Sequence, residues 1–313
     1  MARAAVFPGQ GSQAVGMGRE LAEAFPVARH TFEEVDEALR QRLSRLMFEG
    51  PESDLTLTEN AQPALMAVSL AVMRVLEKEG GFDLARHAAF VAGHSLGEYS
   101  ALCAAGTFTI ADAARLLKRR GQAMQRAVPV GVGAMAALLG LELEAAREVA
   151  EAARQGEVCD AANDNGPGQV VVSGSTAAVE RAVKIAAERG ARRAIMLPVS
   201  APFHCALMEP AAREMEEALA AVAMAAPAVP LIANVTAEPV DDPETIRHLL
   251  VRQVTGLVRW RESVLYMRRE GVDAVVELGA GRVLAGLVKR IDREIAAASV
   301  GTPAEIETFL KTL

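Results

Sequence analysis

Apolar residues along the chain follow two alternating spacings, one typical of buried strands and the other typical of helices. The short apolar run Ala4–Phe7 ends in Pro8-Gly9 and predicts a first strand. Helical spacing follows at about 17–25 and 28–47. Alternation of this kind is typical of an α/β fold, in which helices cover a largely parallel sheet.

The next part of the chain continues this alternation and contains an unusually apolar helix. Pro63 opens a stretch to about Glu79 that is apolar on most faces, which predicts a central helix. Ala88–Ala92 is predicted to be a buried strand, and a glycine-rich turn leads from it into a helix that ends near Gly106. The segment 110–126 is strongly amphipathic and predicts a further helix.

The pattern changes after Pro129, where short elements replace the long ones. Their predicted order is β-α-β-β-α-β, the split pattern of a ferredoxin-like unit. Longer elements then resume, including a strand at 273–278 and a helix at 282–293. We therefore predict one large α/β subdomain, residues 1–128 and 198–313, interrupted by a small ferredoxin-like α+β subdomain, residues 129–197.

The composition is that of a globular protein without a nucleic-acid or membrane partner. Of the 313 residues, 51% are hydrophobic, and the net charge of −7 gives no reason to expect binding to nucleic acid. The longest uncharged run, Ala218–Ala237, contains Pro227 and Pro230, so it is predicted to be a helix end, a turn and a short strand. The N-terminus shows no signal-peptide pattern, and we expect a cytoplasmic protein.

Neither the cysteines nor the glycines point to a bound cofactor. Cys103, Cys159 and Cys205 show no C-x-x-C spacing, so neither a disulfide framework nor a zinc site is predicted. Gly279-Ala-Gly281 follows a predicted strand, but the next glycine is Gly286, which does not fit the spacing of a dinucleotide-binding turn. We expect no metal and no cofactor.

The strongest local signal for chemistry is a serine between two glycines. Gly93-x-Ser95-x-Gly97 lies between an apolar strand and a helix, the context in which this pattern marks a nucleophile elbow. Such a turn holds the hydroxyl near a helix N-terminus, where developing negative charge is stabilised. The N–H of Leu96 would then be a natural oxyanion donor. The alternative is a serine that only caps an ordinary helix.

A serine nucleophile needs a base, and five histidines are available. His204 lies in a proline-punctuated loop after a predicted strand, where an α/β sheet collects reactive groups. His94 is adjacent to Ser95, although neighbours around a tight turn usually diverge. The others, His30, His87 and His248, are predicted to lie on the surface or in a loop. A third member is not evident among Asp112, Asp160 and Asp164, so a backbone carbonyl is the alternative orienting group.

One arginine lies on the apolar face of the 110–126 helix. Arg120 shares a stripe with Leu117 and Met124 at i, i+3, i+4 and i+7 spacing, whereas the other basic residues lie on or near the opposite face. Burying an unpaired guanidinium is costly. Arg120 therefore pairs either with an internal carboxylate or with the carboxylate of a substrate, which its planar fork can bind through two bonds.

Together these segments resemble the malonyl-CoA:acyl-carrier-protein transacylase family of bacterial fatty acid synthesis. The resemblance covers essentially the whole chain and rests on several long motifs in the right order. These motifs are Phe7-Pro-Gly-Gln-Gly-Ser-Gln13, Gly93-His-Ser-Leu-Gly-Glu-Tyr-Ser-Ala-Leu102, Arg120-Gly121 followed by Met124-Gln125, Pro167-Gly-Gln-Val-Val171, Pro202-Phe-His-Cys-Ala-Leu-Met208 and Leu250-Val-Arg-Gln253.

The resemblance implies an α/β-hydrolase-like core with an inserted ferredoxin-like subdomain and a Ser–His dyad in place of a triad. It implies malonyl-CoA as donor, the phosphopantetheine thiol of an acidic acyl carrier protein as acceptor, and a monomeric enzyme without a metal. Phe203 resembles the malonyl-selecting form of the histidine loop. The implied roles are Ser95 as nucleophile, His204 as base and then acid, the N–H groups of Gln10 and Leu96 as oxyanion hole, Arg120 as ligand of the malonyl carboxylate, and the carbonyl of Gln253 as the group that orients His204.

The chain departs from the family pattern in one place. Asn163-Asp164-Asn165-Gly166 has Asp and Gly where relatives often carry an aromatic residue and a serine, so Asn163 and Asn165 serve either the pocket or only the turn. Three alternative functions of the chain stay open. They are a serine thioesterase or hydrolase, an acyltransferase of a polyketide pathway with another acyl-CoA donor, and a non-catalytic docking subunit that has kept the fold.

Overall fold

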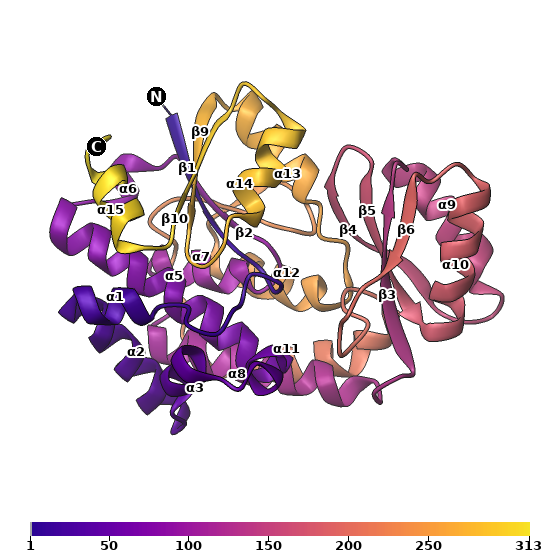
Figure 1. Ribbon diagram of the computed structural model, residues 1–313, viewed down its shortest axis with the longest axis horizontal. Helices are drawn as coiled ribbons and strands as arrows, with labels where there is room; N and C mark the ends of the chain where they lie inside the picture. The colour runs from indigo at the N-terminus through magenta and orange to yellow at the C-terminus, as the bar shows by residue number, and fades with distance from the viewer. Residues whose placement is uncertain (1) are drawn as a thin grey trace.

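A six-stranded sheet forms the centre of the larger part of the computed structural model, which describes residues 2–313 (Figure 1). The strands run in parallel from β10 to β7, and only the short edge strand β8 is antiparallel. In spatial order the sheet consists of β10 (Ala296–Val300), β9 (Val272–Leu278), β1 (Ala2–Phe7), β2 (Phe90–Gly93), β7 (Leu231–Ile232) and β8 (Pro239–Val240).

Helices cover both faces of this sheet because successive residues of its buried strands point in opposite directions. Ala5 and Phe7 belong to the core beneath the N-terminal helices, whereas Ala4 and Val6 pack on the face that α13 and α14 cover. The helices of this part are α1 (Arg19–Ala24), α2 (Pro26–Leu39), α3 (Leu43–Glu49), α4 (Glu52–Thr56), α5 (Thr58–Gly80), α6 (Leu84–His87), α7 (Gly97–Ala104), α8 (Ile110–Ala127), the 3₁₀ turn η1 (Ala206–Met208), α11 (Glu209–Ala220), α12 (Pro243–Thr255), α13 (Trp260–Arg269), α14 (Val283–Ile291) and α15 (Pro303–Leu310).

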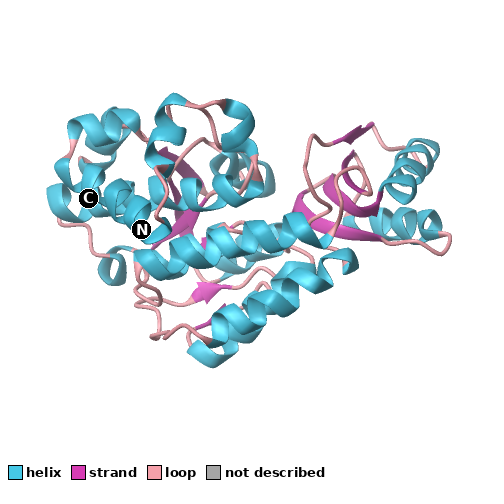
Figure 2. Ribbon diagram, turned by 90° about the horizontal axis from the view of Figure 1, so that it is seen from below, coloured by secondary structure: helices cyan, strands magenta, loops and turns pink. Residues whose placement is uncertain are grey.

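The second, smaller sheet lies at one end of the molecule with two helices on one side (Figure 2). Its chain order is β3 (Gly133–Leu139), α9 (Leu143–Arg154), β4 (Cys159–Gly166), β5 (Gln169–Ser175), α10 (Thr176–Glu188) and β6 (Arg193–Met196). All neighbouring strands are antiparallel, and their spatial order is β4-β5-β3-β6. This is the ferredoxin-like arrangement that the β-α-β-β-α-β pattern predicts. The mixed α/β architecture expected from the sequence is therefore confirmed, while the boundaries at 128/129 and 197/198 stay a prediction.

The two sheets are tied together through strand β4. The backbone of Val258, just before α13, exchanges two hydrogen bonds with β4, to Ala162 O and from Asp164 N, each at 2.9 Å. An ion pair between Arg261 and Glu142 joins the same two parts. Helices α13 and α14 both pack against β4. The β4–β5 hairpin is thus held against the carboxyl side of the large sheet.

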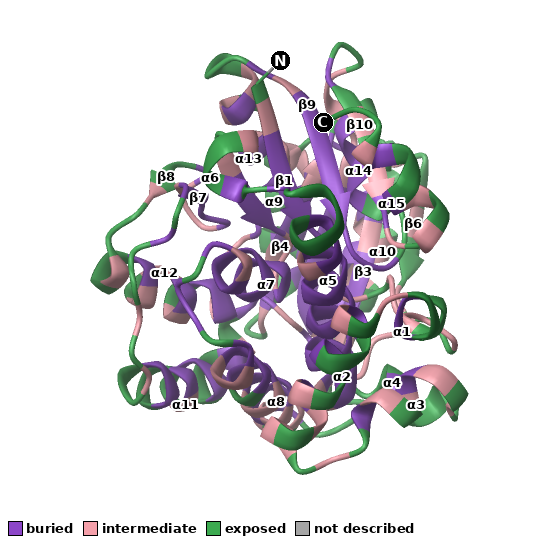
Figure 3. Cartoon of the chain, turned by 90° about the vertical axis from the view of Figure 1, so that its left-hand side faces the viewer, coloured by how far each residue is buried: buried purple, intermediate pink, exposed green. Residues whose placement is uncertain are grey.

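Two predicted helices differ from the structure at their ends. Helix α5 begins at Thr58 rather than at Pro63, and it is buried along most of its length (Figure 3). Proline is tolerated there because its missing N–H removes only the bond to the Glu59 carbonyl in the first turns of the helix. The predicted helix at 28–47 is two helices, because Arg40 takes a left-handed φ of 49° and ends α2.

Other predicted elements agree more closely with the structure. The strand predicted at Ala88–Ala92 is shifted to Phe90–Gly93, and α8 extends the predicted 110–126 by one residue. The uncharged run Ala218–Ala237 contains the end of α11, a loop and the strand β7, as expected. Among residues 2–313, no helix has the length and hydropathy needed to span a bilayer.

Candidate active site

Strand β2 ends in a sharp turn that carries Ser95 into helix α7. Ser95 has a φ of 54°, a left-handed conformation that costs a non-glycine residue energy and occurs mainly where the surroundings enforce it. A Cβ on Gly93 would lie 1.9 Å from Gly97, and a Cβ on Gly97 would lie 2.2 Å from the Phe7 oxygen. Glycine is therefore required on both sides of the serine, as the elbow prediction requires.

The serine hydroxyl meets His204. Its Oγ lies 2.8 Å from His204 Nε2, and His204 Nδ1 lies 2.8 Å from the backbone oxygen of Gln253 in α12. Because a carbonyl oxygen only accepts, Nδ1 carries the ring proton and Nε2 is free to accept the proton of the serine. The structure thus brings together three of the residues singled out in the sequence, which lie in the turn after β2, the loop after β6 and helix α12.

The competing candidates for base and orienting group lie elsewhere. His94 Nε2 bonds to Asn165 Oδ1 at 2.8 Å, so this histidine contacts the β4–β5 hairpin instead of the serine. Asp112 pairs with Arg115 and Asp160 with Arg154. Within residues 2–313, His204 forms no hydrogen bond or ion pair with a carboxylate. A Ser–His pair oriented by a backbone carbonyl is the arrangement present.

Burial keeps His204 neutral. His204 is 3% exposed, and desolvation, with the positive charge of Arg120 as the second cause, lowers its pKa to about 3. A histidine with a lowered pKa holds its lone pair throughout the neutral range, so it can accept a proton at pH 7 without first losing one.

Two backbone N–H groups lie free beside the elbow. In the part of the chain that the structure describes, neither Gln10 N nor Leu96 N donates a hydrogen bond. The turn that carries Gln10 lies against the elbow, since Phe7 O accepts from His94 N at 3.1 Å and a Cβ on Gly9 would lie 2.7 Å from His94 O. Leu96 immediately precedes α7, where the helix dipole also favours negative charge. The two N–H groups are available for an oxyanion.

Arg120 reaches the serine from α8 and is 1% exposed. Its Nη1 donates to Gln62 Oε1 at 2.8 Å, and its Nη2 donates to Ser95 Oγ at 3.1 Å and to Gln253 Oε1 at 2.8 Å. All of these partners are neutral, and Arg120 forms no ion pair with any residue from 2 to 313. Of the two explanations for a buried arginine, the structure removes the internal carboxylate partner and leaves the carboxylate of a ligand.

Three residues of this network were not singled out from the sequence. Gln62 of α5 holds Arg120, Asn234, two residues after β7, accepts from Ser95 N in the elbow, and Glu98 lies in the first turn of α7. Asn234 had a detectable signal, because polar residues that follow a buried parallel strand often serve the site at its carboxyl end. Gln62 and Glu98 lie within helical sequence and have no comparable local signal.

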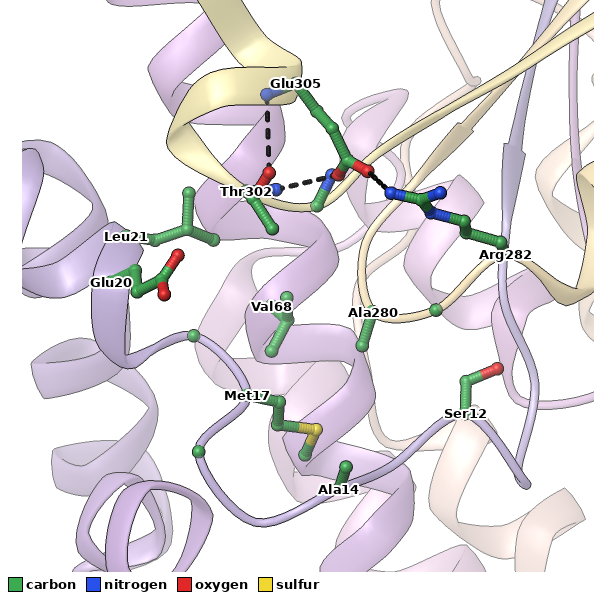
Figure 4. A pocket seen from close by; sticks show the side chains of 14 residues that line it. Ser12, Ala14, Met17, Glu20, Leu21, Val68, Ala280, Arg282, Thr302 and Glu305 are labelled. Carbon is green, nitrogen blue, oxygen red and sulfur yellow. Dashed lines mark hydrogen bonds and ion pairs between the residues drawn. The ribbon is translucent and has the colours of Figure 1, made fainter.

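A separate hollow of about 380 Å³ is lined by residues between Ser12 and Leu21 and by the loops after β9 and β10 (Figure 4). Ser12 and Met17 line one side, and Arg282 points across it to pair with Glu305 at 2.6 Å. Neither Ser95 nor His204 contributes to it. This hollow is not the place where an acyl group meets the serine.

Comparison with known proteins places this geometry in a family. Residues 5–305 match the acyl transferase domain family. The chain is 46% identical over 309 residues to the malonyl CoA-acyl carrier protein transacylase of Bacillus subtilis strain 168, covering 98% of this chain and 96% of that protein. It is 45% identical to the enzyme of the same name from Escherichia coli K12, with 98% of each chain covered.

Solved structures agree with the sequence relatives. The acyl-carrier-protein S-malonyltransferase of Bartonella henselae superimposes with a TM-score of 0.97 at 57% identity, covering 100% of this chain and 99% of that one. A malonyl transacylase solved in complex with a type II polyketide acyl carrier protein gives 0.96 at 44% identity, with both chains fully covered. The chain belongs to the malonyl-CoA:acyl-carrier-protein transacylase family of acyltransferases.

Proposed function

We propose that this enzyme transfers the malonyl group of malonyl-CoA to the phosphopantetheine thiol of an acyl carrier protein, in fatty acid synthesis, through a malonyl ester on Ser95. The observation that carries the proposal is the contact of Ser95 Oγ with both a neutral histidine and an arginine that has no carboxylate partner among residues 2–313. The first makes the serine nucleophilic, and the second selects an acyl group that ends in a carboxylate.

In the first half-reaction Ser95 is acylated. His204 Nε2 takes the hydroxyl proton as Oγ attacks the thioester carbonyl, and the N–H groups of Gln10 and Leu96 bind the oxyanion. Arg120 binds the distal carboxylate of the malonyl group. When the tetrahedral intermediate collapses, the C–S bond breaks, and coenzyme A leaves as a thiol with the proton from His204.

The second half-reaction reverses these steps with a different thiol. The phosphopantetheine thiol gives its proton to His204 as its sulfur attacks the malonyl ester in the same oxyanion hole. The C–O bond to Ser95 then breaks, and Oγ recovers the proton from His204. No metal or further cofactor takes part in this scheme, since each step only moves one proton and one acyl group.

The fate of the malonyl group tests this function against hydrolysis. With radiolabelled malonyl-CoA and excess carrier protein, we expect most of the label on the carrier protein and little as free malonate. The control omits carrier protein, and label should then accumulate only to the level of the enzyme itself. Free malonate as the main product with carrier protein present would instead identify a thioesterase.

Exposed basic residues mark where we place the acidic carrier protein. Arg290 at the end of α14 donates to Gln169 Oε1 at 3.0 Å, at the turn of the β4–β5 hairpin. Arg192 lies on the other side of this turn, because Gly140 contacts both Arg192 and Gly168. Asn165, on the same hairpin, contacts the histidine next to Ser95. The hairpin therefore leads from this basic rim to the serine.

Charge reversal at this rim should weaken acceptor binding selectively. R192E/R290E is expected to raise KM for the carrier protein about tenfold, because two surface charge contacts of up to about 1 kcal/mol each become repulsive. Transfer to free pantetheine, which has the same thiol without the protein, should be unchanged. The matched control is R45E, an exposed arginine on α3. Equal effects of the two variants on KM would contradict this docking face.

The remaining expectations about location and assembly are predictions. A cytoplasmic enzyme would meet both malonyl-CoA and the carrier protein, and a monomer would leave the basic rim open. Sedimentation of the purified chain measures its assembly state directly.

A further inference from the structure

A buried carboxyl group lies directly behind the elbow and has no part in the scheme above. Glu98 is in the first turn of α7, three residues after the serine, and is 2% exposed. Its Oε1 accepts from the backbone N–H of Asn234 at 2.6 Å, and its Oε2 accepts from Gln253 Nε2. Burying a carboxyl group away from water costs free energy, so we looked for a function of this group beside the reacting serine.

Gln253 connects this carboxyl group to the reacting residues. Its backbone oxygen accepts from His204 Nδ1, and its side-chain Oε1 accepts from Arg120 Nη2 at 2.8 Å. The other end of the same amide, Nε2, donates to the backbone oxygen of Ser95 at 2.8 Å and to Glu98. One side chain therefore links the nucleophile, the arginine and the buried carboxyl group.

The two ends of this amide are not interchangeable. A glutamine amide can rotate by half a turn and exchange its oxygen for its NH₂ group. In the rotated state an NH₂ group would face the Arg120 guanidinium, donor against donor, and an oxygen would face the Ser95 carbonyl. Burial raises the pKa of Glu98 to about 8, so its carboxyl group carries a proton over much of the neutral range. Its Oε2 accepts from the NH₂ end of Gln253 in this state too, and this contact disfavours the rotation.

Asn234 fixes Glu98 in turn. Its side-chain Oδ1 accepts from Ser95 N at 2.8 Å, and its Nδ2 donates to Gly93 O at 2.7 Å. The asparagine is thus locked to both sides of the elbow, and its own N–H holds one oxygen of Glu98. The other oxygen is left to face Gln253, so the position of the carboxyl group is set relative to the serine.

We propose that Glu98 is a positioning residue for acyl selection: through Gln253 it holds the Arg120 guanidinium where the carboxylate of the acyl group binds. This role rests on the proposed malonyl transfer. Glu98 touches neither the acyl group nor the departing thiol, and its effect reaches the substrate through the amide of Gln253 and then Arg120. Its loss should therefore change the choice of acyl group more than the ability to transfer one.

The isosteric variant E98Q tests this role. With the side-chain oxygen of residue 98 still accepting from Asn234, its new NH₂ group would face the NH₂ of Gln253 and favour the rotated amide. We expect KM for malonyl-CoA to rise about tenfold, the scale of one lost hydrogen bond to a charged group. KM for acetyl-CoA, which has no distal carboxylate, should stay within about twofold, and any fall in kcat should be shared by the two donors.

A second buried carboxyl group supplies the matched control. Glu277 is 0% exposed and accepts from Leu284 N and Ala285 N at the start of α14, away from the serine. E277Q should lower the thermal unfolding midpoint without changing the ratio of malonyl to acetyl turnover. If E98Q keeps the wild-type ratio, or if E277Q shifts it equally, Glu98 is only structural.

A double-mutant cycle tests whether Glu98 acts on Arg120 through Gln253. Q253M keeps the backbone oxygen for His204 but removes the amide, so it should shift the malonyl-to-acetyl ratio by itself, and adding E98Q should shift it no further. Additive shifts would overturn the proposal. If E98Q does not fold, E98M/Q253M replaces both partners and should match Q253M. If the wild-type enzyme does not transfer malonyl at all, the proposed function itself is wrong. Failure of the function can therefore be distinguished from failure of the role proposed for Glu98.

Discussion

Replacing Ser95 with alanine should reduce kcat/KM for malonyl transfer by at least about 10⁴-fold, the scale seen when a serine nucleophile is removed. The reason is that Ser95 Oγ lies 2.8 Å from His204 Nε2 and no other hydroxyl among residues 2–313 contacts this nitrogen. The oxyanion donors and Arg120 remain in S95A, so malonyl-CoA should still bind. Rates with the carrier protein measure the loss, and a binding titration with malonyl-CoA measures what remains.

Intact-mass spectrometry checks the covalent step directly. Wild-type enzyme mixed with malonyl-CoA should gain the mass of one malonyl group, and S95A should gain none. Ser100 provides the control: it is buried in the same helix, its Oγ has no hydrogen-bond partner in residues 2–313, and S100A should acylate normally. An adduct that persists on S95A would mean that another residue is the nucleophile.

Replacing Arg120 with alanine should lower kcat/KM for malonyl-CoA by about 10²–10³-fold, because a substrate carboxylate would be left in a dry pocket without its cation. The relative rate with acetyl-CoA should rise. In the structure the guanidinium reaches Ser95 Oγ at 3.1 Å, so a carboxylate held by it lies beside the reacting acyl carbon. Turnover of malonyl-CoA and of acetyl-CoA, measured with the wild-type enzyme and with R120A, gives the ratio of the two rates for each enzyme.

The neighbouring arginine serves as control for this variant. Arg119 is on the same helix but half exposed, and it pairs with Glu214 and Glu217 rather than with the serine. R119A should keep the wild-type preference for malonyl-CoA. If R120A left malonyl turnover unchanged and acetyl turnover no higher, the selection of the acyl group would have to lie elsewhere in the pocket.

Local sequence was sufficient for the elements and for the elbow. Apolar spacing predicted the strands at 4–7 and 273–278 and the amphipathic helix at 110–126, because burial on one face leaves a periodic pattern. It did not find the break after Leu39, since the apolar spacing continues across the turn, nor the start of α5 at Thr58, since a proline can lie inside the early turns of a helix.

The sequence by itself determined the α/β fold, the strained serine between two glycines and the presence of one arginine on an apolar face. Each of these is encoded within a few neighbouring residues. Only the tertiary structure decided between His204 and His94 as partner of Ser95, because the contact joins residues 109 positions apart. It alone showed that Arg120 has no carboxylate partner among residues 2–313 and that Glu98, Asn234 and Gln253 form one network. Such networks depend on which strands and helices lie side by side, and the packing of the whole chain sets that.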